Sequence, residues 1–400
     1  MPSSPSSSIR LNDLTHPIVA GLISVIVNYG GTFILVFQAA RVAGLTPEIT
    51  ASWVWSVSVG VGLTGLFLSW RYREPIITAW STPAAAFLVT ALATTPFEEA
   101  IGAYVLSAAA FVVLGLSGYF ERVIRLIPPG LASGLLAGIL LQFGIGAFGG
   151  ASVDPVLVGL LIVAYLVLKR LSARYAVVGI LVIGLVFLLA QERVDLSELQ
   201  LQFAIPVFTM PVFSLNAALS VALPLFLITL TGQYMPGMLV LRNDGFKTSA
   251  NPIVTVTGLG SLIMAPFGSH AFNVAAITAA IATGREAHED PSKRWIAGIA
   301  AGVFYVFVGV FGVTLAAVFM AFPATFITTL AGLALLGTIG GSLAAAMAEP
   351  ASREAALITF LASGANITML GIGGAFWGLV IGLVAYGVLN GRPGRKQSAE

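Results

Sequence analysis

Long apolar stretches, separated by short charged clusters and by Gly and Pro, dominate the pattern of this 400-residue chain. A helix that crosses a bilayer core about 30 Å thick needs about 20 predominantly apolar residues. The pattern predicts fourteen transmembrane segments, with both chain ends on the same side of the bilayer. The segments lie near 17–41, 48–70, 75–95, 97–120, 128–149, 153–170, 174–190, 213–241, 249–265, 266–284, 293–320, 322–348, 353–365 and 367–390.

The third and tenth segments cannot be plain spanning helices. Segments 9 and 10 together are too short for two helical crossings and a turn at about 1.5 Å per residue. An extended piece at about 3.3 Å per residue removes the deficit. Gly268-Ser269-His270 lies where the break in segment 10 would fall, and Trp80-Ser81-Thr82-Pro83 marks the corresponding break in segment 3. Interrupted helices at membrane depth are typical of the substrate sites of transporters.

Each break predicts a half-helix that begins near the middle of the bilayer. Ser81 and Thr82 suit an N-cap and Pro83 suits the first helical position, with a half-helix reaching about Thr95. The second half-helix is expected to begin at Gly268-Ser269-His270. Their N-termini would face one another and hold an anion through free N–H groups and partial positive charge. The alternative for segment 3 is a continuous helix kinked at Pro83.

Composition agrees with a polytopic membrane protein. Hydrophobic residues make up 58% of the chain and charged residues 9%, whereas soluble domains carry about 25% charged residues. The first apolar run is too long for a signal-peptide core and is read as an uncleaved helix. Cysteine is absent, which excludes disulfides and thiolate chemistry. No cofactor, metal ion or nucleic-acid partner is expected.

Basic residues predict the orientation. Of the 19 Lys and Arg residues, all except Arg41 and Arg193 fall in loops that share the side of the two termini. This is a strong positive-inside signal and predicts cytoplasmic termini. A protein of this kind is expected in the inner (cytoplasmic) membrane, with the lipid bilayer as its surroundings.

An internal repeat supports the count of segments. Gly31, Arg41 and Gly44 keep the mutual spacing of Gly232, Arg242 and Gly245, and Pro129 with Leu136-Ala137-Gly138 matches Pro323 with Leu330-Ala331-Gly332. Seven segments per half is an odd number, so the second half must be inverted relative to the first. The predicted fold is an all-α polytopic protein with a 7+7 inverted repeat.

Polar and aromatic side chains gather at the two breaks and at repeat-related positions. His270 is the only histidine placed at membrane depth, so it is a candidate proton carrier, although a hydrogen-bonded structural role is the alternative. Polar groups in lipid-embedded helices also often only bridge helices. The candidate substrate-binding residues are Asn28, Tyr29, Trp80, Ser81, Thr82, Gln233, Gly268, Ser269, His270, Phe272 and Asn273.

Two other kinds of site are disfavoured. Gly60-Val61-Gly62-Leu63-Thr64-Gly65 fits a dinucleotide-binding pattern, but it lies inside an apolar segment with no preceding strand. Small residues at that spacing predict close helix packing instead. A membrane-embedded enzyme would need a buried nucleophile and base or a metal cluster, and the sequence offers no such grouping. The chain is therefore not expected to be an enzyme.

From His16 to Asn390 the chain resembles the benzoate/proton symporter (BenE) family. The resemblance is carried by four stretches: Asn28-Tyr29-Gly30-Gly31, Ile77-Thr78-Ala79-Trp80-Ser81-Thr82-Pro83, Leu230-Thr231-Gly232-Gln233-Tyr234 and Phe267-Gly268-Ser269-His270-Ala271-Phe272-Asn273. It implies the fold of nucleobase and sulfate-type permeases, with a core and a gate domain, and the homodimer through the gate in which such proteins are often found.

That fold implies a division of this chain. The core domain would comprise residues 15–126 and 213–320, and the gate domain residues 127–191 and 321–390. Residues 1–14 and 391–400 would be tails, the first of them disordered.

The resemblance also implies the substrate. The nucleobase branch uses carboxylates in the eighth and tenth segments, where this chain has Gln233, Ser269, His270 and Asn273. A nucleobase therefore fits poorly, and an anion fits better. The resulting expectation is proton-coupled uptake of an aromatic carboxylate such as benzoate, by movement of the core against the gate, with His270 carrying the proton. Another small organic anion or a nucleobase-like ring is the alternative substrate.

Overall fold

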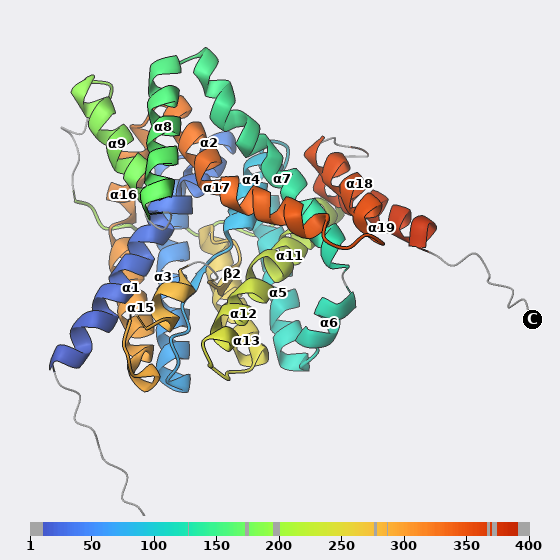
Figure 1. The fold of residues 1–400 in the computed structure, drawn as a ribbon, viewed down its shortest axis with the longest axis horizontal. Coiled ribbons are helices and arrows are strands. Elements are labelled where there is room, and N and C mark those ends of the chain that lie inside the picture. Colours follow the sequence, from blue (N-terminus) through green and yellow to red (C-terminus); the bar gives the residue numbers. More distant parts are fainter. Residues whose placement is uncertain are drawn as a thin grey trace, which may run out of the picture.

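The computed structural model describes residues 11–126, 128–172, 176–194, 201–275, 278–285, 287–365, 369 and 374–390. It is almost entirely helical (Figure 1). Within the described residues, eight helical stretches are long and apolar enough to cross a membrane. Residues 1–10 of the predicted N-terminal tail and all of the predicted C-terminal tail, 391–400, lie outside the described residues.

The first half of the chain contains nine α-helices and one strand among its described residues. They are α1 (Leu11–Thr32), α2 (Ile34–Val42), α3 (Pro47–Tyr72), β1 (Thr78–Trp80), α4 (Thr82–Ala91), α5 (Phe97–Ser117), α6 (Phe120–Leu126), α7 (Pro129–Gly149), α8 (Pro155–Ser172) and α9 (Ala176–Ala190). A short 3₁₀ turn, Gly150–Ser152, follows α7.

The second half has the same general order of elements. They are α10 (Leu215–Ala217), η2 (Ala218–Ala222), α11 (Leu223–Thr229), η3 (Leu230–Tyr234), α12 (Met235–Asn243), α13 (Ala250–Met264), η4 (Ala265–Phe267), β2 (Phe272–Val274), α14 (Ala279–Thr283), η5 (Pro291–Lys293), α15 (Trp295–Val310), α16 (Gly312–Met320), α17 (Ala324–Ala346), α18 (Arg353–Gly364) and α19 (Gly374–Asn390).

Three predicted helix boundaries were wrong. The N-terminal helix begins at Leu11 rather than after residue 14. The residues before the apolar run continue the helix because helical hydrogen bonds satisfy their backbone N–H and C=O groups. The first predicted segment is two helices that meet at Thr32 and Phe33, after the weak helix formers Gly30 and Gly31.

The third misplaced boundary is the end of the half-helix in segment 3. This helix ends at Ala91 rather than at about Thr95. The residues that follow form a turn, in which the Thr95 N–H bonds the Ala91 carbonyl. The Ala91 carbonyl at the C-terminus of the helix therefore has a partner without a further helical turn.

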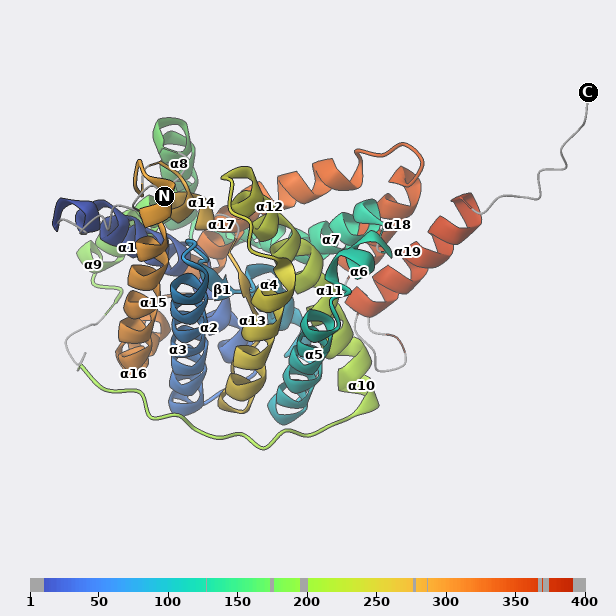
Figure 2. The same cartoon turned by 90° about the horizontal axis from the view of Figure 1, so that it is seen from below.

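Two sets of helices pack among themselves. In the first set α15 packs on α3, α13 packs on α5 and on α3, and α1 packs on α15. Figure 2 shows α15, α3, α13 and α5 side by side. In the second set α7 packs on α17 and α18, α18 on α19, and α8 on α9.

Glycine makes a close contact between α3 and α15 possible. A Cβ on Gly62 would lie 2.6 Å from the carbonyl oxygen of Gly302 on α15, and one on Gly302 would lie 2.7 Å from the carbonyl oxygen of Gly62. The helix-packing interpretation of the Gly60–Gly65 stretch is therefore confirmed.

An extended strap, residues 201–214, crosses the ends of α3, α5 and their neighbours opposite α8 and α14 (Figure 2). Its Val207 N–H bonds Ser52 Oγ on α3 at 2.9 Å, and its Val212 N–H bonds the Glu98 carbonyl on α5 at 3.0 Å. Thr209 N–H bonds the Pro266 carbonyl at 2.7 Å. The strap therefore ties helices of the first set together.

Candidate functional site

The two interrupted segments meet as a two-stranded antiparallel sheet. Strand β1 pairs with β2 in the register Thr78 to Val274, Ala79 to Asn273 and Trp80 to Phe272. Flanking hydrogen bonds run from Ser81 N–H to the Ala271 carbonyl at 2.9 Å and from Ala275 N–H to the Ile77 carbonyl at 2.8 Å. Extended backbone inside a helical bundle leaves its polar groups without helical partners, and this pairing satisfies them.

The first break was correctly placed. Ser81 is the N-cap of α4, and its Oγ accepts the Ala84 N–H at 3.3 Å. The same oxygen accepts the Thr229 hydroxyl of α11 at 2.9 Å. Since Pro83 has no N–H and the Ala84 N–H is capped, the N–H and hydroxyl of Thr82 are the first-turn donors left for a ligand.

The second break was correctly expected, but its geometry was not. No half-helix begins at Gly268-Ser269-His270, since this stretch turns at Gly268 with φ of 104° and continues extended into β2. Helix α14 begins only at Ala279 and has five residues. Pairing with β1 engages backbone N–H groups of the second break that a helix N-terminus would have left free for a ligand. The two segments therefore meet through strands, and the expected helix N-terminus does not form at Gly268-Ser269-His270.

The residues of β2 hold the break in place through buried hydrogen bonds. The Phe272 N–H bonds Ser261 Oγ at 2.8 Å, and the Phe272 carbonyl accepts the Tyr234 hydroxyl at 3.0 Å. The Asn273 amide accepts from the Ser81 N–H and donates to the Val274 carbonyl, each at 2.9 Å. Phe272 and Asn273 therefore join the two breaks and α13 in one network.

His270 is fully buried beside this network. Its Nδ1 accepts the indole N–H of Trp53 on α3 at 3.2 Å, which places the proton of the neutral ring on Nε2. Nε2 faces the main chain of Ser81 without a well-formed hydrogen bond. Ser269 Oγ donates to the His270 carbonyl at 3.1 Å.

A cavity of about 900 Å³ lies next to the first break. Its size is within the range of small-molecule sites. Both sets of helices contribute to its wall. The lining residues are Val27, Asn28, Thr32, Ala79, Trp80, Thr82, Pro83, Tyr165, Lys169, Val177, Val178, Gly232, Gln233, Pro236, Ala275, Thr278, Ile281, Gly284, Arg285, Ala334, Leu335, Gly337 and Thr338.

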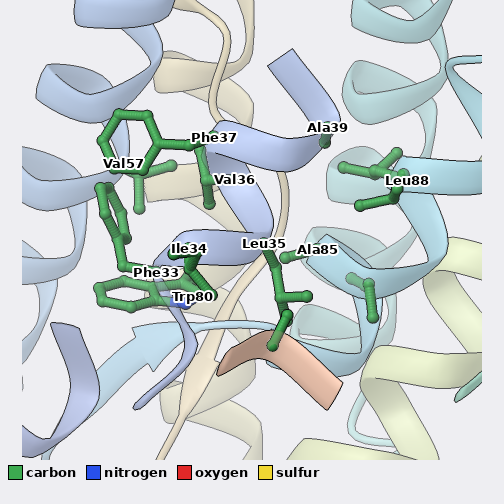
Figure 3. Close-up of a cluster of buried hydrophobic side chains, with 14 of the residues drawn as sticks. Phe33, Ile34, Leu35, Val36, Phe37, Ala39, Val57, Trp80, Ala85 and Leu88 are labelled. Carbon is green, nitrogen blue, oxygen red and sulfur yellow. The ribbon is translucent and has the colours of Figure 1, made fainter. Parts of the chain in front are cut away.

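Trp80 forms the aromatic part of the cavity wall. Its ring centroid lies 4.7 Å from that of Phe33 and 5.1 Å from that of Tyr29. Figure 3 shows Phe33 and Trp80 next to one another at one edge of the buried cluster. The indole N–H of Trp80 is buried and has no hydrogen-bond partner among the described residues. Trp80 is fully buried, so this N–H is not exposed to the cavity.

Amide groups line the cavity beside Trp80. Asn28 Nδ2 donates to the Tyr305 hydroxyl at 2.8 Å, and this bond positions the Asn28 side chain. Gln233 lies in η3, a π-helical turn that interrupts the helix. Pro236 follows four residues after Gly232 and cannot donate to its carbonyl, which explains the wider turn. Such turns are frequent at functional sites.

Four of the predicted site residues line the cavity, namely Asn28, Trp80, Thr82 and Gln233. Seven others do not, and they surround it or support it: Tyr29, Ser81, Gly268, Ser269, His270, Phe272 and Asn273.

The sequence reasoning did not select several polar lining residues. These are Thr32, Tyr165, Lys169, Thr278, Arg285 and Thr338. The pattern of charges could have found Lys169 and Arg285, which are basic residues at the ends of the sixth and tenth predicted segments. The described part of the chain holds no cluster of metal-ligating side chains.

Comparison with known proteins places the chain in a family. The sequence profile of the benzoate membrane transport protein family (BenE) matches residues 13–388. The benzoate membrane transport protein of Acinetobacter baylyi is 41% identical over 371 residues, which cover 93% of this chain and 94% of that protein. The inner membrane protein YdcO of Escherichia coli is 41% identical over 383 residues, covering 96% and 98%.

Solved structures with low sequence identity share the fold. SLC26A9 superposes with a TM-score of 0.65 at 13% identity, covering 96% of this chain and 66% of that one. The transmembrane domain of the cyanobacterial bicarbonate transporter BicA superposes with a TM-score of 0.61 at 14% identity, covering 95% and 98%. The protein is thus an all-helical, multi-span membrane protein of this architecture, and the chain belongs to the BenE family of benzoate membrane transport proteins.

Proposed function

We propose that this protein transports benzoate or a closely related aromatic carboxylate across the inner membrane. Family membership and two relatives at 41% identity, one a benzoate transport protein and one an inner membrane protein, support this. The observation that carries the proposal is the lining of the large cavity, in which Lys169 and Arg285 join Trp80 and several uncharged donors. An aromatic ring can pack on that wall while a carboxylate accepts from buried donors.

The electrostatic character of the cavity favours an anion. Lys169 and Arg285 line it, and the part of the chain that the structure describes contributes no Asp or Glu to its lining. Asn28, Thr82 and Gln233 offer further donors. A nucleobase presents N–H groups that call for an acidic acceptor, and this wall has none. Another small organic anion is the alternative substrate.

Transport of labelled benzoate into proteoliposomes tests this proposal. Saturable uptake that unlabelled benzoate abolishes and uracil leaves unchanged is the expected result. Thr82→Val keeps the shape of the side chain and removes the hydroxyl donor, so it should raise the KM for benzoate about tenfold, the effect of losing one hydrogen bond to a charged group. Wild-type protein that takes up uracil and ignores benzoate would contradict the proposal.

We propose a 7+7 inverted repeat with a core and a gate domain for the transmembrane architecture. The antiparallel pairing of β1 with β2 supports it, because a twofold relation between the halves would produce that register. The two packing sets also support it, since the first contains α1, α3, α5, α13 and α15 and the second α7, α8, α9, α17, α18 and α19. Substrate would cross as one set moves against the other. A homodimer through the second set belongs to the same proposal.

The orientation proposal places both termini in the cytoplasm. The distribution of Lys and Arg supports it. Lys169 and Arg285 would then mark the cytoplasmic end of the large cavity, and the present conformation would be open to the inside. The smaller cavity of about 150 Å³, lined by Thr90, Thr94 and Gln142, would lie on the outer side.

We further propose that uptake is coupled to a proton carried by His270. His270 Nδ1 accepts the indole N–H of Trp53. A proton on Nδ1 would turn this acceptor into a donor that faces the Trp53 N–H, so the imidazole ring would have to turn away. Because His270 lies against the main chain of Ser81, that movement would reach the N-cap of α4 and the cavity. The measurement is benzoate accumulation in proteoliposomes with and without an inward proton gradient.

A further inference from the structure

Two cationic side chains that line the large cavity, Lys169 and Arg285, are exposed, whereas Trp80 is fully buried. Lys169 lies in the last turn of α8, and Arg285 follows α14. They come from different packing sets, since α8 packs on α9 and α17 whereas α14 packs on α1, α12 and α15. Figure 2 shows α8 and α14 at the same end of the molecule, opposite the strap.

Both cations belong to the cavity wall. The Lys169 ammonium lies 5.9 Å from the ring centroid of Tyr165, a second lining residue. Arg285 follows Gly284, which also lines the cavity. Among the described residues that line the cavity, none is acidic.

The chemistry of the wall changes between its buried and its exposed parts. Near Trp80 the wall offers uncharged donors from Thr82, Asn28 and Gln233, and at the exposed part it offers two full positive charges beside the apolar side chains Val177 and Val178. A carboxylate moving between these parts would pass from hydrogen-bond donors to cations.

We propose that Lys169 and Arg285 form an anion site at the mouth of the cavity, which holds the substrate carboxylate between solution and the inner site. The inference rests on the proposed function for its substrate class. The positive potential of the pair concentrates carboxylates in the mouth and favours them over neutral aromatic molecules. Because the two residues belong to different packing sets, an anion between them also links those sets.

The test is benzoate binding to purified full-length protein in detergent without anionic lipid, by isothermal titration calorimetry, with benzamide as the neutral isostere. Lys169→Gln and Arg285→Gln should each weaken benzoate binding about three- to tenfold at low ionic strength. This loss of benzoate affinity should be smaller at 0.15 M salt or more, because the Debye length is then about 8 Å or less and the charges are screened. Benzamide binding should not change.

Arg170→Gln is the matched control. Arg170 lies in the same last turn of α8 as Lys169 but does not line the cavity. The substitution therefore removes an equal charge from the same helix end without changing the cavity wall. Lys169→Arg keeps the charge and should keep wild-type affinity, which separates the charge from a folding defect. Repeating the titrations in nanodiscs rich in phosphatidylglycerol shows whether lipid headgroups compete for the pair.

Benzoate affinity in Lys169→Gln and Arg285→Gln equal to that of Arg170→Gln would overturn the anion site. Equal loss of benzamide and benzoate binding would also overturn it, because a charge site must act on the charged ligand. Wild-type protein that binds no benzoate would instead contradict the proposed function.

Discussion

The indole N–H of Trp53 donates to Nδ1 of His270 across 3.2 Å, and this bond links α3 to the second interrupted segment. Both side chains are fully buried. The bond fixes which ring nitrogen carries the proton in the neutral form. His270 is therefore held by α3, a helix of the first set, although it is not among the lining residues of the cavity.

His270→Gln tests the coupling proposal. Glutamine can accept from Trp53 but cannot carry a proton, so the variant should retain benzoate exchange and lose accumulation driven by a proton gradient. Exchange and accumulation are measured on the same proteoliposomes. Trp53→Phe is the control, because it removes the partner of the ring and keeps the imidazole, and it should still accumulate benzoate. Wild-type accumulation by His270→Gln would remove His270 from the mechanism.

Ser81 is expected to tolerate loss of its hydroxyl better than addition of bulk. Ser81→Ala removes the N-cap and the bond from Thr229, which should cost about 1–2 kcal/mol of stability and leave transport detectable. Ser81→Leu should abolish transport, since Ser81 is fully buried between the strands and α4. Thermal melting and uptake of both variants are compared.

Thr229→Val separates the two roles of Ser81. It removes the same interhelical hydrogen bond and leaves the N-cap of α4 intact. A smaller loss of melting temperature than in Ser81→Ala is expected. Wild-type transport by Ser81→Leu would show that the cavity at this break is not the substrate site.

Gly62→Ala tests the packing of α3 on α15. Its added Cβ would meet the Gly302 carbonyl oxygen at 2.6 Å and the Val306 Cγ2 at 2.8 Å, so destabilisation by about 1–3 kcal/mol is expected. Gly159→Ala on α8 is the control, because no atom lies within 4 Å of the added carbon. Its melting temperature should equal or slightly exceed that of the wild type. Equal melting of both variants would contradict the packing account.

Cysteine labelling tests the orientation. The chain has no cysteine, so single substitutions can be read without background. Glu98→Cys should react with an impermeant maleimide from the outside of intact cells, and Arg122→Cys only after permeabilisation. Both positions are exposed at helix ends. The reverse pattern would invert the proposed topology.

The sequence alone determined the apolar segments and the positions of both interruptions. The length of an apolar segment and the positions of Gly, Pro and charged residues are local properties of the sequence. They were therefore sufficient to locate the breaks at Trp80-Ser81-Thr82-Pro83 and at Gly268-Ser269-His270. The cap at Ser81 was also found, since N-cap and Pro preferences depend on neighbouring residues alone.

The geometry of the second break depended on tertiary structure. Whether residues 269–274 form a helix or a strand depends on a partner, and that partner is β1, far away in the sequence. The cavity could not be predicted for the same reason. Lys169 in α8 and Arg285 after α14 line the same cavity as Trp80 only because two packing sets enclose one space. Side-chain type fixes what a residue can bind, but only the packing of distant segments decides which residues share a cavity.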